Sequence, residues 1–165
     1  MLGLILIVLA SLPPGTSCGA DEPTIAVGIL SGLGPSPSGL VAAVWSNGRM
    51  LRAKVPADPR QGYVEARLPA AQVEALDRLV SESGIWSWKQ PSMPLDLPED
   101  LISVCVTDRR RSFRDTPGMR KASPQRRIAE YLLGLPLDGP RASEEPAPQI
   151  WIKWFRRTTD GAESK

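Results

Sequence analysis

The chain has 165 residues, of which 20 are Lys or Arg, 18 are Asp or Glu and none is His, so its formal net charge is +2 at pH 7. The absence of His excludes Ser-His-Asp and Cys-His catalysis and every zinc site that needs an imidazole ligand. A charge so close to neutral argues against a nucleic-acid-binding protein, which normally carries a strong basic excess. The length suits one domain with tails.

Residues 1–20 have the composition of a signal peptide or lipoprotein leader. They contain no charged side chain, and their apolar run at 2–12 has the length of a secretory hydrophobic segment, which is too short to span a bilayer. The sequence GTSC at 15–18 resembles the lipobox of bacterial lipoproteins, in which the Cys, here Cys18, becomes the acylated first residue, although a Gly stands where Leu is usual. Cleavage before Asp21 and an uncleaved anchor are the alternatives. In each case we expect export, either to the cell envelope with a lipid anchor or to the periplasm or medium.

The chain has one other cysteine, Cys105, so the exported part has no second thiol for an intramolecular disulfide. A lone Cys in a predicted strand is more often a small buried side chain than a reactive thiol, and no His is present to activate it. We therefore assign Cys105 to the interior of the domain.

The clearest local signal after the leader is the pair Asn47-Gly48 between two β-prone runs at 40–55. It is typical of a hairpin with a two-residue type I′ turn, which needs positive φ at both positions. Such a turn fixes the register of the strands. The pairs on one wholly apolar face would be Val44 with Leu51, Ala42 with Ala53, and Leu40 with Val55. Val41 would lie on the other face, so we expect Val44→Asp to unfold the domain and Val41→Asp to be milder.

Two further strands are predicted at 25–30 and 63–68, and the Gly-, Pro- and Ser-rich stretch 31–39 reads as a loop between the first of them and the hairpin. This loop lacks the third Gly of a dinucleotide-binding motif and the Gly-Lys-Ser/Thr of a phosphate loop. We therefore predict no nucleotide cofactor, and no other cofactor motif is present.

The best helix in the sequence follows Pro69 and covers residues 70–83, ending at Gly84. Its apolar residues recur at helical spacing and form one stripe, which is our candidate cover for the apolar face of the hairpin. The stripe consists of Val73, Leu76, Leu79 and Val80. Ile85, Trp86 and Trp88 follow directly, and we expect them to close one end of the same core; an exposed aromatic pair is the alternative.

The second half of the domain predicts another hairpin and another helix. Residues 90–100 form a Pro-rich loop with three carboxylates, but they lack the oxygen-ligand spacing of a calcium loop, so we predict no metal site. A strand at 101–107, a turn at 108–111 and a returning strand at 112–115 make the hairpin. A second helix begins at Ser123-Pro124 and runs to Leu133.

The single α+β domain is therefore assigned to residues 21–135. Residues 136–149 contain repeated Pro and read as a linker, and residues 150–155, IWIKWF, predict an edge strand or an exposed segment for a partner. Residues 156–165 are expected to be disordered.

One stretch is strongly charged, with eight basic residues and only two acidic ones between Asp108 and Arg127. The basic residues are Arg109, Arg110, Arg111, Arg114, Arg120, Lys121, Arg126 and Arg127. One interpretation is a docking patch for anionic lipid, an acidic polysaccharide or an acidic protein. The other is a solvated turn and helix flank that keeps the second hairpin soluble.

The order of strand, Asn-Gly hairpin, Leu68-Pro69 helix with ALDRLVSESGIW, second hairpin and terminal helix covers about two thirds of the chain. In this order the chain resembles small bacterial lipoprotein domains of unassigned function and, more distantly, the emfourin-type inhibitors of thermolysin-like metallopeptidases. The resemblance implies an α+β fold and a non-catalytic role, and it carries over no inhibitory residue.

Together these features predict an α+β domain with an antiparallel sheet built from two hairpins and two helices packed on one face. For function we favour an exported, lipid-anchored, non-catalytic binding module of the cell envelope. An inhibitor of a thermolysin-like metallopeptidase is the first alternative, and a small hydrolase that works without His is the second.

Overall fold

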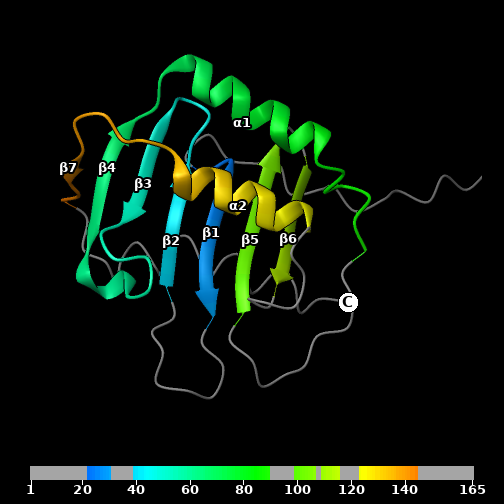
Figure 1. Ribbon diagram of the computed structural model, residues 1–165, viewed down its shortest axis with the longest axis horizontal. Coiled ribbons are helices and arrows are strands. Elements are labelled where there is room, and N and C mark those ends of the chain that lie inside the picture. Colours follow the sequence, from blue (N-terminus) through cyan, green and yellow to red (C-terminus); the bar gives the residue numbers. More distant parts are fainter. Residues whose placement is uncertain (1–21, 31–38, 90–98, 107–108, 116–122, 145–165) are drawn as a thin grey trace, which may run out of the picture.

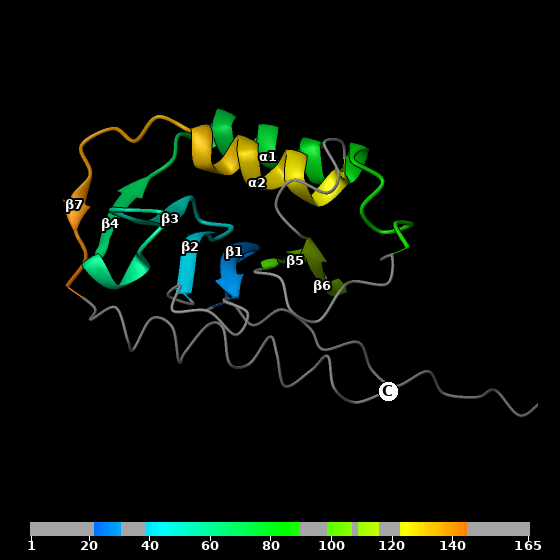
Figure 2. The ribbon, with the colours of Figure 1, turned by 60° about the horizontal axis from the view of Figure 1, so that its bottom comes forward.

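The computed structural model describes residues 22–30, 39–89, 99–106, 109–115 and 123–144. Within these ranges the strands form one antiparallel sheet in the order β6-β5-β1-β2-β3-β4-β7, and two helices lie side by side on one of its faces (Figures 1 and 2). The α+β fold predicted from the sequence is confirmed. The elements are β1 (Ile25–Leu30), β2 (Gly39–Val44), β3 (Arg49–Ala53), the 3-10 turn η1 (Pro59–Gln61), β4 (Tyr63–Arg67), α1 (Ala70–Glu82), β5 (Glu99–Val106), β6 (Arg109–Asp115), α2 (Pro124–Gly134) and β7 (Arg141–Ala142).

Helix α1 lies with its predicted apolar stripe against the sheet. Leu76 and Val80 are buried, and Val73 and Leu79 pack beside them as half-buried residues. The charged residues of the opposite side of the helix are exposed, as 3.6-residue periodicity requires.

Helix α2 starts as the sequence predicts, because the Ser123 hydroxyl accepts a hydrogen bond from the backbone N–H of Arg126 at 3.2 Å and Pro124 occupies the first turn. Ile128 and Leu132 on its inner side are fully buried. The two helices, β1, β2, β5 and β6 thus enclose the main core, to which Ile85, Trp86 and Trp88 also contribute as predicted.

The first hairpin forms, but its turn is one residue longer than predicted. The Trp45 N–H donates to the Arg49 carbonyl at 2.9 Å, and the Gly48 N–H donates to the Trp45 carbonyl at 2.9 Å, so three residues separate the paired positions. Gly48 takes the positive φ of 81° that such a loop needs, and the Asn47 side chain accepts a hydrogen bond from the Arg49 N–H at 2.9 Å. The predicted register was therefore wrong by one residue.

This shift moves half of the predicted apolar face to the other side of the sheet. Val44 pairs with Met50, and both belong to the main core, whereas Leu51 pairs with Ala43 and faces away from the helices. Because the side-chain period of a strand is two, a one-residue slip reverses the face of every residue on one strand. Val55 lies beyond the end of β3 and is 36% exposed.

A bulge in β2 changes the predicted placement of Val41. Val27 of β1 pairs with Ala42, but the next residue, Gly28, pairs with Leu40, so Val41 is the extra residue. Both Val41 and Val44 then reach the main core, each 2% exposed. The expectation that Val41 lies on a milder, less buried face was wrong.

The face of the sheet opposite the helices carries a second buried cluster. Its members are Leu40, Ala43, Trp45, Leu51, Ala53 and Tyr63, which are between 0% and 4% exposed. The Tyr63 hydroxyl donates to the Leu40 carbonyl at 2.7 Å, and burial raises the pKa of this phenol to about 12. The sheet is therefore buried on both faces at β2 and β3.

The second hairpin places Ile102 opposite Phe113 and Val104 opposite Arg111, and the three apolar members of these pairs are buried. Its second strand, β6, begins at Arg109, three residues before the predicted start.

Within the predicted Pro-rich linker, β7 pairs with Val64 and Glu65 of β4 at the far edge of the sheet. The leader, Cys18, the predicted strand at 150–155 and the tail at 156–165 lie outside the described residues. In the described part of the chain, no helix has the length and apolarity to cross a bilayer.

Candidate functional site

A polar cleft of about 820 Å³ opens at the β4–β7 edge of the sheet, between β3, β4 and the chain around β7. Six of the residues that line it are charged: Arg49, Glu65, Arg67, Asp138, Arg141 and Glu144. Three guanidinium groups and three carboxylates thus face one concave surface, whereas the interior next to it is apolar. Cavities of this volume are large enough for a ligand or a peptide segment.

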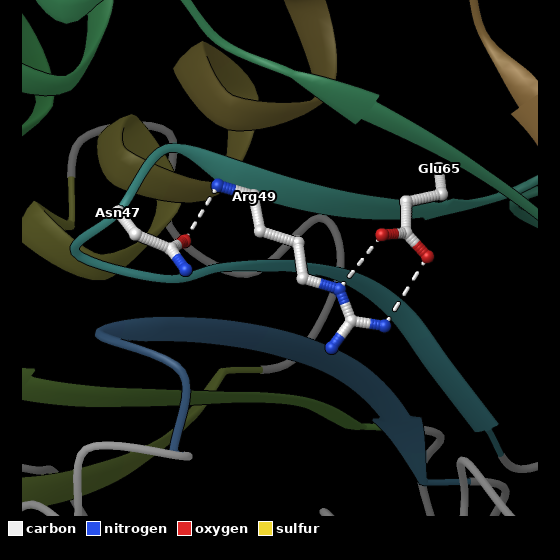
Figure 3. Close-up of polar contacts among 3 residues, drawn as sticks. All are labelled: Asn47, Arg49 and Glu65. Carbon is white, nitrogen blue, oxygen red and sulfur yellow. Dashed lines mark hydrogen bonds and ion pairs between the residues drawn. The ribbon is translucent and has the colours of Figure 1, made fainter.

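Arg49 and Glu65 form the fixed floor of this cleft. Arg49 Nε lies 2.9 Å from Glu65 Oε1 and Arg49 Nη2 lies 3.2 Å from Oε2, a bidentate pair across neighbouring strands (Figure 3). The Arg49 guanidinium also stacks over the Trp45 ring, with 4.6 Å between its Cζ and the ring centroid. The half-exposed guanidinium is therefore held in one orientation by two independent contacts.

Arg67 and Arg141 stand on either side of this pair. In the strand register Arg67 is opposite Arg49, and Arg141 is opposite Glu65, so all four residues lie on the same side of the sheet. Both outer arginines are exposed, and neither has an ion-pair partner among the described residues. Like charges placed directly opposite each other destabilise a sheet, and Glu65 neutralises only one of these arginines. The guanidinium groups of Arg67 and Arg141 therefore remain available to an anion, while Asp138 and Glu144 bring the formal charge of the whole lining to zero.

One residue of the predicted basic patch, Arg111, has its guanidinium bound within the domain. The Arg111 guanidinium donates to three backbone carbonyls, at 2.6 Å to Trp86, 2.6 Å to Trp88 and 3.4 Å to Ile85, and it stacks 4.9 Å above Phe113. Arg111 thus ties the chain after α1 to β6.

The other described residues of the patch are divided between two elements, β6 and α2. Arg109, Arg110 and Arg114 belong to β6, where they pair with Val106, Cys105 and Leu101. On α2, Arg127 is exposed, and Arg126 lines a smaller groove of about 300 Å³ whose walls include Val27, Val41 and Ala129. Arg120 and Lys121 lie outside the described residues.

The cleft was not foreseen from the sequence. Arg49 and Glu65 are 16 positions apart, and only the pairing of β3 with β4 brings them together. The alternation of charged and apolar residues in β4, YVEAR, was a usable signal, because it places Glu65 and Arg67 on one face. The strand β7 gave no signal, since a two-residue strand after a Pro resembles a loop.

The lining groups can bind and orient a ligand through guanidinium donors and carboxylate acceptors. No group of three or more metal-ligating side chains occurs in the portion of the chain that the structure describes. Comparison of the chain with protein-family models, with curated proteins and with solved structures gave no match.

Proposed function

We propose that this chain is an exported, lipid-anchored binding module of the cell envelope and that its site is the cleft at the β4–β7 edge. The observation that carries the proposal is the placement of Arg67 and Arg141 on either side of the fixed Arg49–Glu65 pair. Export and anchoring are supported by the composition of residues 1–20 and by the GTSC motif at 15–18.

The ligand that suits this geometry best is an acidic segment of a protein. Strand β7 pairs only with Val64 and Glu65, so the outer backbone edge of Ala66 and Arg67 has no strand partner among the described residues. An extended segment can add to such an edge through main-chain hydrogen bonds. Its carboxylates would then bind the guanidinium groups of Arg67 and Arg141, which gives the interaction a strong dependence on salt.

Binding of a fluorescent poly-glutamate peptide to the full chain tests this proposal. We expect Arg67→Glu and Arg141→Glu each to weaken binding at least tenfold at low salt. The matched control is Arg127→Glu, an exposed charge reversal on α2 in the predicted basic patch. A loss of binding in the Arg127 variant with none in the Arg67 variant would place the acidic ligand on the patch and contradict the proposed site.

Mass spectrometry of the mature N-terminus tests the anchor separately. A diacylglyceryl group on Cys18 is the expected result. A mature chain that starts at Asp21 would remove the lipid anchor but leave the binding site unaffected.

Inhibition of a thermolysin-like metallopeptidase is a second candidate function. The observation in its favour is that β7 lies at the outer edge of the sheet with both of its residues, Arg141 and Ala142, exposed, the position from which a chain can enter a substrate groove. Incubation with thermolysin separates the two functions, since no inhibition at a large molar excess of this chain would exclude the inhibitor.

A further inference from the structure

Neither helix covers the second buried cluster. Its six residues are at most 4% exposed, yet α1 and α2 both lie on the opposite face of the sheet (Figure 2). A sheet face that carries Trp45, Leu51 and Tyr63 would lose much of its stabilisation if water reached it, because large apolar side chains stabilise a fold chiefly through their burial. Another part of the same folded chain must therefore exclude water from this face.

The described chain ends beside this cluster. The Ser143 N–H donates to the carbonyl of Tyr63, a member of the cluster, at 3.0 Å, so the backbone leaves β7 at the edge of the sheet next to this cluster. Residue 150 follows Glu144 by six positions and can reach about 20 Å. The strands that carry the cluster, β2 to β4, span only about 10 Å at roughly 4.8 Å per strand.

We propose that residues 150–155, IWIKWF, cover the second face of the sheet, the one that carries the second buried cluster, in the mature protein. Five of these six side chains are apolar or aromatic, which matches the chemistry of the face. The other apolar stretch outside the described residues is 2–12, and it belongs to the leader that export would remove. A cover for the mature domain has to come from residues that remain in it.

Chemical crosslinking of paired thiols tests this placement in the full chain. In a Cys18→Ser/Cys105→Ser background, Ala43→Cys is combined with Ile152→Cys, or with a Cys at Ile150 or Trp154, and treated with dibromobimane. We expect an intrachain crosslink for at least one of these pairs. The matched control is Ala42→Cys with the same partners, because Ala42 is equally buried but lies on the helix side of the same strand.

Three results would overturn the proposal: no crosslink from Ala43→Cys at any of the three positions, crosslinks that join two chains, or a crosslink to Ile7→Cys in the leader instead. A second measurement uses Ile152→Asp/Trp154→Asp. We expect the thiol of Ala43→Cys to react at least tenfold faster with a thiol reagent in this variant, while the thiol of Ala42→Cys stays protected. An unchanged rate at position 43 would also contradict the proposed cover.

Discussion

Gly48 and Leu68 are in direct contact where the first hairpin meets the entry to α1. The Leu68 N–H donates to the Gly48 carbonyl at 2.8 Å, and a Cβ at position 48 would lie 2.9 Å from the Leu68 carbonyl oxygen. The φ of Gly48 is +81°, a conformation that side chains rarely adopt. This one position therefore sets both the turn and the approach of β4 to β3.

We predict that Gly48→Ala destabilises the protein by about 1–3 kcal/mol, because the substitution combines a left-handed backbone with a steric contact. The free energy of unfolding from urea titration measures this effect. Gly134→Ala is the control, since a Cβ there meets nothing within 4 Å and should change stability by less than about 1 kcal/mol. Equal effects at the two glycines would mean that the contact with Leu68 carries no cost.

Arg111 links three carbonyls of the segment after α1 to the edge of the sheet. Its loss would leave the carbonyls of Trp86 and Trp88 without this donor, and hydrogen bonds to charged groups contribute about 1.5–3 kcal/mol. We expect Arg111→Ala to lower the free energy of unfolding by about 2 kcal/mol or more. Arg127→Ala, an exposed change on α2, should stay within about 0.5 kcal/mol of the original chain. An Arg111→Ala variant with an unchanged free energy of unfolding would mean that these hydrogen bonds add no stability and that Arg111 behaves as a solvated surface residue.

Local signals were enough to predict most elements of this fold. The N-cap at Ser123, the Pro before α1 and the alternation of Ile102 and Val104 each depend on a few neighbouring residues, and each has its predicted structure. These signals depend on backbone chemistry that is complete within one turn of helix or one strand.

The register and the cleft could not be predicted in the same way. Asn47-Gly48 suits a two-residue turn and a three-residue turn almost equally well, and the choice between them depends on whether Leu51 finds an apolar cluster on the far face. The bulge at Val41 likewise depends on β1. The Arg49–Glu65 pair needs both strands in place before its charges meet.

The corrected register gives a different expectation for the two valines of β2. Val41 and Val44 are each 2% exposed in the main core, so an Asp at either position would bury a carboxylate without a partner. We predict that Val41→Asp and Val44→Asp both cost at least about 3 kcal/mol. Circular dichroism and thermal melting of the two variants measure this loss. A clearly milder Val41→Asp would show that the bulge does not bring residue 41 into the core.

Ionisation of the Tyr63 phenol, in the second cluster, makes the free energy of unfolding depend on pH in the alkaline range. Burial raises its pKa from 10.0 to about 12 in the folded protein, so the folded state holds this proton more tightly than the unfolded state does. A group with a raised folded pKa contributes its stabilisation fully below the unfolded value, and this contribution is lost as the pH rises from about 10 to about 12. We therefore expect the free energy of unfolding to fall across this interval by an amount on the order of 2 kcal/mol.

Tyr63→Phe isolates this contribution. At neutral pH the variant should be less stable by about 1 kcal/mol, because it loses the hydrogen bond to the Leu40 carbonyl. Between about pH 10 and pH 12 the difference should shrink and then reverse, because Phe has no proton to lose. Urea titrations at several pH values measure both effects, with the exposed Tyr131→Phe as the control that should follow the original chain. Parallel curves for the original chain and Tyr63→Phe would mean that the phenol ionises as easily in the folded state as in the unfolded one, and that the second face is open to water.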